Sequence, residues 1–142
     1  MLTARHLLER KGSEVHSVGP EDAVLDAIRL MAERHVGALL VMRGTELVGI
    51  VSERDYARKV ILLGRSSGDT RVRQIMSSPV TTVTPGHTVS ECMKIVTEQR
   101  VRHLPVVEQG RVVGVVSIGD LVKAVIEDQQ QQIEQLERYI TS

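Results

Sequence analysis

The chain repeats itself. Residues 15–55 align without a gap on residues 80–120 when the sequence is shifted by 65 positions. Of the 41 aligned pairs, 13 are identical, whereas about three or four would be expected by chance in a valine-rich chain of otherwise ordinary composition. The chain therefore has to fold as two copies of one structural unit, and its function has to be compatible with that duplication.

Both copies show the same order of predicted elements: a strand, a helix, a hairpin and a second helix. A short alternating run ends before Pro20 in one copy and before Pro85 in the other, which indicates a strand followed by a turn. Apolar residues at helical spacing follow, and then two apolar runs flank a glycine-containing turn, as is typical of a hairpin. We expect strands at 15–18, 38–42 and 46–51 and again at 80–83, 104–107 and 111–116, first helices around 24–31 and 89–96, and second helices that begin near Ser52 and Ser117.

These elements predict an α+β fold of two tandem βαββα repeats. Neither copy can cover both faces of its small sheet alone, so we expect the copies to pack sheet to sheet. The Gly- and Ser-rich stretch at 65–71 is the expected linker. The predicted domains are the first repeat with an N-terminal helical turn at 1–64, the linker, the second repeat at 72–128 and a helical C-terminal extension at 129–142.

The composition argues against several functions. The 18 basic residues balance the 18 acidic ones, whereas nucleic-acid-binding proteins usually carry a basic excess. No apolar run approaches the roughly 18 residues needed to cross a bilayer, and no signal region follows the N-terminus. We therefore expect a cytoplasmic protein that binds neither nucleic acid nor membranes.

The cysteine and histidine content predicts neither disulfides nor metal sites. Cys92 is the single cysteine, which excludes an internal disulfide, and its alignment with Ala27 predicts a small buried thiol. No pair among the five histidines has the spacing of a helical metal site, so no metal ligand is predicted.

One short motif occurs twice and carries the strongest functional signal. Residues 49–55 read Gly-Ile-Val-Ser-Glu-Arg-Asp and residues 114–120 read Gly-Val-Val-Ser-Ile-Gly-Asp. Residues 101–106, Val-Arg-His-Leu-Pro-Val, precede the second hairpin. With these three segments the chain resembles the cystathionine-β-synthase (CBS) domain pair over nearly its whole length, and in particular the stand-alone proteins that contain a single pair.

This resemblance implies a pseudo-two-fold disc whose clefts, between the two copies, bind adenine-containing ligands. AMP is the first expectation, and ATP, ADP, NAD(H) and S-adenosylmethionine are the other candidates. Binding would shift the arrangement of the copies, and a partner protein would respond to that shift. A role as regulator rather than enzyme agrees with the sequence, in which no catalytic triad and no Gly-rich phosphate loop is recognisable. The alternative function is a protein-interaction or dimerisation module without a physiological nucleotide.

The motif also has suitable chemistry for a nucleotide. A carboxylate can accept hydrogen bonds from both ribose hydroxyls, and Asp55 and Asp120 lie in the first turns of predicted helices. The serines of the motif and the free N–H groups of these helix starts suit phosphate oxygens, and Arg54 would add a charged donor. The predicted ligand-binding residues are His16, Ala38, Ser52, Arg54, Asp55, Val83, Arg102, His103, Leu104, Pro105, Ser117 and Asp120.

Ser-x-x-Asp also has a purely structural interpretation. Its spacing is close to that of a capping box, in which the serine caps a helix and the acidic residue returns a hydrogen bond. Recurrence at the same place in both copies favours the ligand interpretation, in which the serine caps and the aspartate still faces the cleft. The two sites are expected to differ, because Gly119 replaces Arg54 in the second copy and Leu40 replaces the family's usual proline in the first.

The C-terminal segment follows a different pattern from the repeats. Ile126, Gln129, Ile133, Leu136 and Ile140 fall at heptad spacing over about two heptads, which is short for a coiled coil. Such a helix either packs back on its own repeat or frays, or it forms a dimer contact that covers its apolar stripe. The resemblance to dimeric discs favours a homodimer.

Overall fold

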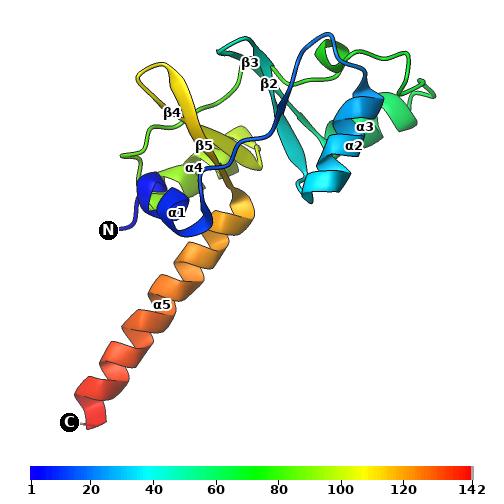
Figure 1. Ribbon diagram of the computed structural model, residues 1–142. Helices are drawn as coiled ribbons and strands as arrows, with labels where there is room; N and C mark the ends of the chain where they lie inside the picture. The colour runs from blue at the N-terminus through cyan, green and yellow to red at the C-terminus, as the bar shows by residue number, and fades with distance from the viewer. Residues whose placement is uncertain (142) are drawn as a thin grey trace. The chain divides into compact units, whose positions relative to one another are not determined.

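The computed structural model describes residues 1–141 and confirms the α+β class, the repeated order of elements and the long C-terminal helix (Figure 1). The first repeat contains β1 (Ser17–Val18), α2 (Val24–Arg34), β2 (Ala38–Arg43), β3 (Glu46–Ser52), α3 (Glu53–Tyr56) and the π-helix η1 (Ala57–Ile61). The second contains α4 (Val89–Gln99), β4 (His103–Glu108), β5 (Arg111–Ser117) and α5 (Ile118–Thr141). Two further short helices precede the repeats: α1 (Ala4–Lys11) and the 3₁₀ helix η2 (Val72–Gln74).

The chain forms two compact units whose boundaries differ from the order of the repeats in the sequence. The first-repeat unit comprises Glu14–Thr81 and Gln109–Val112, and the second-repeat unit comprises Met1–Ser13, Thr82–Glu108 and the chain from Val113. Each segment that precedes one repeat therefore packs with the other repeat. The order of the sequence predicts the opposite grouping, the N-terminal helix with the first repeat and residues from 72 onward with the second, because adjacency is the only guide that a sequence offers.

The two preceding segments dock in the same way. Thr3 forms an antiparallel bridge with Thr88 at the start of α4, and Arg71 forms one with Ala23 at the start of α2. The N–H of Ala4 donates to the carbonyl of His87 at 2.8 Å, and the N–H of Val72 donates to that of Asp22 at 2.9 Å. The internal symmetry thus extends to the preceding segments, in which Ala-Arg-His-Leu-Leu at 4–8 corresponds to Val-Arg-Gln-Ile-Met at 72–76.

Proline explains a difference between the two sheets. In the first-repeat unit the sheet order is β1-β2-β3, with β1 parallel to β2 and β2 antiparallel to β3. In the second-repeat unit β4 pairs with β5, and the predicted strand at 80–83 is reduced to a parallel bridge between Val83 and Val106. The N–H of Leu40 donates to the carbonyl of His16 at 3.1 Å. Pro105 occupies the equivalent position and has no N–H to donate, so the same ladder cannot continue.

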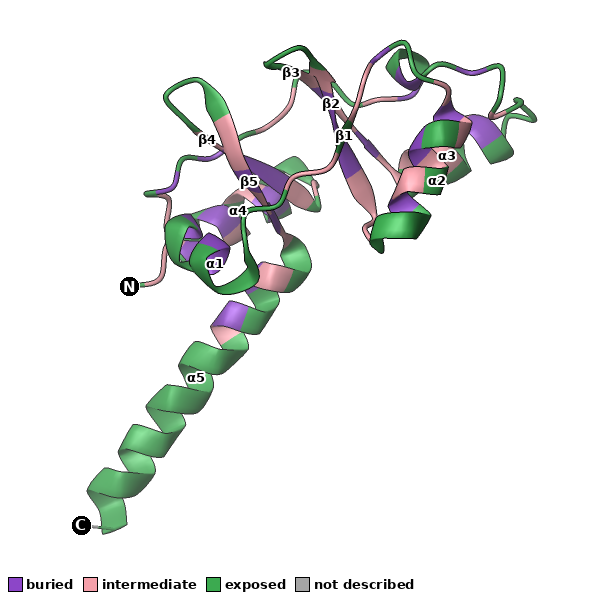
Figure 2. Ribbon diagram, in the orientation of Figure 1, coloured by how far each residue is buried: buried purple, intermediate pink, exposed green. Residues whose placement is uncertain are grey.

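Each unit has its own aliphatic core. The predicted inner faces of the first helices are confirmed, since Val24 and Met31 of α2 and Val89 and Val96 of α4 are buried (Figure 2). Cys92 is fully buried beside them as a free thiol, and burial raises the pKa of this thiol, which disfavours the reactive thiolate. The preceding segments supply further core residues, namely Ala4, Leu7 and Leu8 in the second-repeat unit and Val72 and Ile75 in the first-repeat unit.

Motif glycines allow these segments to approach the sheets closely. A Cβ atom on Gly114 would lie 2.6 Å from Cδ2 of Leu8, and one on Gly49 would lie 2.5 Å from Sδ of Met76. Any side chain larger than glycine at the start of the motif would therefore displace Leu8 or Met76.

Across residues 1–141, no helix combines the length and the apolar character of a membrane-spanning segment.

We predict that Gly114→Ala destabilises the protein, because its methyl group would push Leu8 and with it α1 away from the sheet. Overpacking of this kind costs about 1–3 kcal/mol, which chemical denaturation measures. Gly86→Ala is the matched control, since the nearest atom to its added Cβ, Oγ1 of Thr84, lies 3.9 Å away and leaves room. Equal stability of the two variants would contradict the close approach of α1.

Candidate functional site

Both copies of the motif form capping boxes at helix starts. In the first repeat the N–H of Ser52 donates to Oδ2 of Asp55 at 3.0 Å, and the N–H of Asp55 donates to Oγ of Ser52 at 3.2 Å. In the second, the corresponding Ser117–Asp120 bonds are 2.8 and 3.1 Å. The structural role that the spacing suggested is thus present in both copies, and it fixes each aspartate at the first turn of its helix.

In each unit a backbone hydrogen bond links the start of this helix to the residue just before a strand. The N–H of Glu53 donates to the carbonyl of Gly37 at 3.1 Å, and the N–H of Ile118 donates to that of Arg102 at 2.8 Å. Ala38 pairs directly with Ser52 across β2 and β3. Strand start and motif therefore meet within each unit, which brings His103 near Asp120.

Lys11 of α1 completes the second-repeat site. Its Nζ lies 2.6 Å from Oδ2 of Asp120 and 2.9 Å from the carbonyl oxygen of Val115. Oδ2 of Asp120 thus accepts from both Lys11 and the N–H of Ser117. Within residues 1–141 the structure assigns no hydrogen bond to the other oxygen, Oδ1. Asp120 is half-buried, with 25% of its side chain exposed.

The site holds an ionised aspartate beside a neutral histidine. Burial opposes ionisation of Asp120, but the hydrogen bonds from Lys11 and from the backbone of Ser117 outweigh it and lower the pKa of the carboxyl below its ordinary value. Burial lowers the pKa of His103, and repulsion by the Lys11 ammonium lowers it further. At neutral pH the site therefore offers a carboxylate acceptor and an uncharged imidazole.

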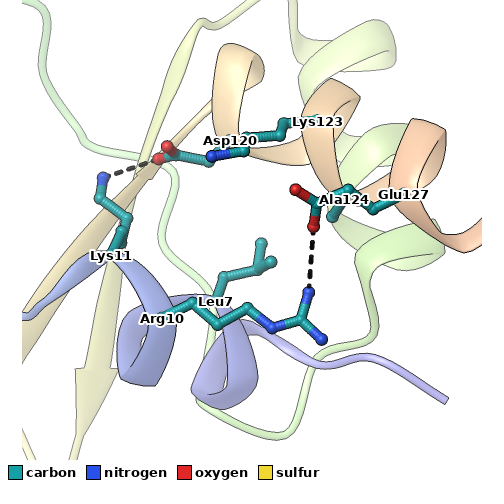
Figure 3. A pocket seen from close by; sticks show the side chains of 7 residues that line it. All are labelled: Leu7, Arg10, Lys11, Asp120, Lys123, Ala124 and Glu127. Carbon is teal, nitrogen blue, oxygen red and sulfur yellow. Dashed lines mark hydrogen bonds and ion pairs between the residues drawn. The ribbon is translucent and has the colours of Figure 1, made fainter.

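A pocket of about 300 Å³ opens beside this carboxylate, between α1 and α5 (Figure 3). The Arg10 guanidinium spans it to reach Glu127 at 3.4 Å, and Lys11 reaches Asp120 on another side. Seven side chains line the pocket, of which three are cationic, two are acidic and two are apolar: Arg10, Lys11, Lys123, Asp120, Glu127, Leu7 and Ala124. The pocket thus combines an acceptor for hydroxyl groups with donors suited to an anion.

In the first-repeat site, no cation of a preceding segment pairs with Asp55 in the part of the chain that the structure describes. Asp55 instead pairs with Lys59 of its own helical segment at 3.1 Å, and Lys59 also donates to the carbonyl of Ile75 at 2.8 Å. Arg54 is exposed on the same helix. His16 is mostly covered and its Nε2 lies 3.8 Å from Glu14. The two motif copies therefore differ in which element provides the lysine.

Several of the predicted ligand-binding residues lie in the core of the second-repeat unit. Val83 and Leu104 are 2% and 0% exposed, so their side chains pack inside the second-repeat unit. Pro105 is buried as well, whereas Arg102 is exposed. The three consecutive residues 104–106 of β4 are all buried. His103, half-buried at the strand start, lies close enough to Asp120 for their charges to interact.

Sequence reasoning missed the three cations of the pocket. Lys11 and Arg10 lie in the segment before the first repeat, and Lys123 lies three residues after Asp120 in α5. No local pattern marks Arg10 and Lys11, since only the docking of α1 on the second repeat brings them to this pocket. Among the described residues, no group of three or more His, Cys, Asp and Glu side chains is placed to hold a metal ion.

Comparison with known proteins agrees with the repeats and the motif. The CBS domain family matches residues 2–61 and 72–127. The chain is similar to the mitochondrial CBS domain-containing protein CBSX3 of Arabidopsis thaliana, with 42% identity over 84% of this chain and 61% of the plant protein. The aligned region thus spans less than two thirds of that relative.

Solved structures show the same likeness. A putative signal-transduction protein with CBS domains from Burkholderia ambifaria is 52% identical, with a TM-score of 0.86 over 89% of this chain and 96% of that one. The CBS domain pair of protein MJ0100, solved with 5′-methylthioadenosine and S-adenosyl-L-methionine, shares the fold at 18% identity, with a TM-score of 0.80 over 90% of this chain and 98% of that one.

Fold and motif together define a duplicated module of the regulatory type. The chain belongs to the CBS domain family and contains two CBS domains.

We predict that Lys11→Met raises the pKa of both Asp120 and His103, because loss of the ammonium makes protonation easier at each group. NMR titration of the carboxyl and imidazole groups measures both values. Arg10→Met is the control, since Arg10 pairs with Glu127 in the same pocket and should leave both values unchanged.

The same variant should change the acid sensitivity of the fold. The lowered pKa of Asp120 stabilises the folded protein above the ordinary value of 3.8, and this contribution is lost as the pH falls through the lowered folded value. Lys11→Met should therefore lose less stability between neutral and acidic pH than the parent protein. An unaltered pH profile, with unaltered Asp120 titration, would contradict the assigned role of Lys11.

Proposed function

We propose that this protein is a regulatory sensor of adenine nucleotides and not an enzyme. AMP is the first candidate ligand, and ADP, ATP, NAD(H) and S-adenosylmethionine are the others. The observation that carries the proposal is the ionised carboxylate of Asp120 on the wall of a pocket that also contains three cationic side chains. Membership of the CBS family and the adenosine-containing ligands of the MJ0100 pair support the choice of ligand class.

Asp120 would bind the ribose. Its Oδ1 accepts one hydroxyl directly, and the neighbouring hydroxyl takes the place of Lys11 at Oδ2. Ser117 would keep its backbone hydrogen bond to the same carboxylate, so the helix cap survives ligand binding. One aspartate thereby serves as both structural cap and ligand contact.

The displaced ammonium of Lys11 would then contact phosphate. Arg10 and Lys123 line the same pocket and add positive charge, and charge-assisted hydrogen bonds to phosphate are stronger than neutral ones. A nucleotide would thus replace an internal ion pair between α1 and α5 with contacts to itself. Because the chain runs from α1 directly into the first repeat, a displacement of α1 on ligand binding would be transmitted to the rest of the chain.

Asp55 would hold ribose in the same manner in the first repeat, with Ser52 as its cap and Arg54 as the phosphate donor. Since Lys59 rather than a residue of a preceding helix pairs with Asp55, we expect this site to bind more weakly or to prefer another ligand. The output of the sensor would be a homodimer whose arrangement a partner protein recognises. The buried free thiol of Cys92 suits a reducing compartment, and we place the sensor in the cytoplasm.

A thermal-shift panel with AMP, ADP, ATP, NAD⁺, NADH and S-adenosylmethionine tests the proposal. A ligand at 100 times its Kd stabilises the native state by about 2.7 kcal/mol, which raises the melting temperature of a domain of this size by several degrees. Asp120→Asn and Asp55→Asn are the informative variants. The side-chain oxygen of asparagine can still accept the hydrogen bond from the serine N–H, whereas its NH₂ group cannot accept a hydrogen bond from a ribose hydroxyl.

We expect a selective shift with at least one nucleotide that Asp120→Asn abolishes. Without ligand this variant should itself melt lower than the parent, because it loses the ion pair with Lys11, so each shift is measured against the same variant without ligand. The same shift in parent and in both variants would show that the aspartates act only as caps. No shift with any ligand, in protein shown to be free of co-purified nucleotide, would overturn the proposal.

The alternative function, an interaction module without a nucleotide, is favoured by one observation: apolar residues of α5 are exposed beyond the second-repeat unit. Truncation after Ile126 separates the two functions, because it retains the buried Leu121 and Ala124 of α5 and removes the exposed end. Loss of partner binding in a truncated protein whose parent shows no nucleotide response would favour the interaction module.

A further inference from the structure

The C-terminal helix presents two different faces. Leu121 and Ala124 of α5 are buried in the second-repeat unit, whereas Val122 and Ile126, on the other side of the same turns, are 42% and 59% exposed. Every residue from Ile126 to Thr141 is exposed, as the uniform colour of this part of α5 in Figure 2 shows. The interpretation in which this helix packs back on its own repeat is therefore wrong for its second half.

The exposed apolar residues form one continuous stripe with a seven-residue period. Ile126, Ile133 and Ile140 occupy one position of the heptad, a, and Val122, Gln129 and Leu136 occupy the other core position, d. At its base the stripe runs into a surface groove of about 570 Å³ lined by Ile118, Gly119, Val122, Lys123, Ile126 and Glu127. A strict heptad spacing in a single exposed stripe is the pattern by which a helix pairs with another like itself.

We propose that α5 forms a parallel two-stranded coiled coil with α5 of a second copy of this chain. The helix has 24 residues, of which the stripe covers nearly three heptads. Isolated helices of this length are marginal in water, so pairing of the stripes would stabilise the exposed half as well as join two chains. This interface would hold the homodimer included in the proposed function, but it does not depend on nucleotide binding.

The residue types of the stripe favour the parallel orientation. Isoleucine occupies all three a positions and leucine one of the d positions, Leu136, and among parallel coiled coils isoleucine at a with leucine at d favours two strands. In that orientation Gln129 meets Gln129 of the second copy, and the two amides can bond to each other. In the antiparallel orientation each Gln129 faces Ile133 of the second copy, so the bond between the two amides is lost. That orientation would instead bring Lys123 close to Glu137 of the second copy and form an exposed ion pair. Exposed ion pairs contribute little, so the amide pair decides the orientation.

Sedimentation of the full chain over a range of concentrations tests the interface. Ile133→Glu should weaken association by roughly a hundredfold or more, because two like charges would enter the apolar seam. Gln135→Glu is the matched control: it adds the same charge two residues away on a different face and should associate like the parent.

Gln129→Leu provides a test that a folding defect cannot imitate. Replacing the polar layer with leucine should tighten association, since apolar d residues stabilise coiled coils at the cost of specificity. A parent chain that stays monomeric at the highest concentration would overturn the proposal. So would an Ile133→Glu variant that remains as dimeric as the parent. The nucleotide thermal shift is measured on Ile133→Glu as well, so that failure of the interface and failure of the sensor are distinguishable.

Disulfide cross-linking tests the orientation. In a Cys92→Ala background, Leu136→Cys should cross-link to itself under mild oxidation, because the d positions face each other in a parallel pair. In an antiparallel pair position 136 faces position 126 of the second copy. Cross-linking only between Leu136→Cys and Ile126→Cys chains in a mixture would therefore overturn the parallel assignment.

Discussion

The close approach of each preceding segment to the sheet of the other repeat is the contact on which the rest of the structure depends. Leu8 of α1 lies over Gly114, and Met76 after η2 lies over Gly49, at distances that would leave no room for a Cβ atom. These segments bury aliphatic side chains in cores that the repeats do not complete alone. The glycine of the motif is thus explained by packing, and the duplicated chain becomes two units whose segments are exchanged relative to the sequence order.

This exchange also builds the candidate site. Docking of α1 brings Lys11 to the carboxylate that caps α5, and the same helix carries Arg10 to Glu127. The ion pair keeps Asp120 ionised despite its partial burial, and it helps to keep His103 uncharged. Core packing and site chemistry are therefore coupled through one short helix. In the first repeat the lysine comes from the capped helix itself, so the two copies of an almost identical motif have different surroundings.

The two halves of α5 have different surroundings. Its first turns carry the capping box and bury Leu121 and Ala124, and its remaining turns present apolar residues outward. The first half is positioned by its own unit, whereas the second half lacks such support within the described chain. The proposed regulator would need a path from the site to a partner, and α5 carries Asp120 in its first turn and the exposed stripe along its remaining turns.

The sequence by itself determined the duplication, the α+β class, the hairpins, the inner faces of α2 and α4 and the positions of both capping boxes. These features follow from local spacing, because periodicity and caps involve residues only a few positions apart. The loss of a full strand at 80–83 has its cause in a single residue, because Pro105 has no N–H to donate. The sequence shows this proline, but the bond that it removes was recognised only from the equivalent pair of Leu40 and His16 in the structure. Tertiary structure alone decided that α1 packs with the second repeat, that Lys11 rather than a motif residue neutralises Asp120, and that Val83 and Leu104 face the core. Those outcomes depend on contacts between residues about a hundred positions apart, for which neither composition nor spacing provides a signal.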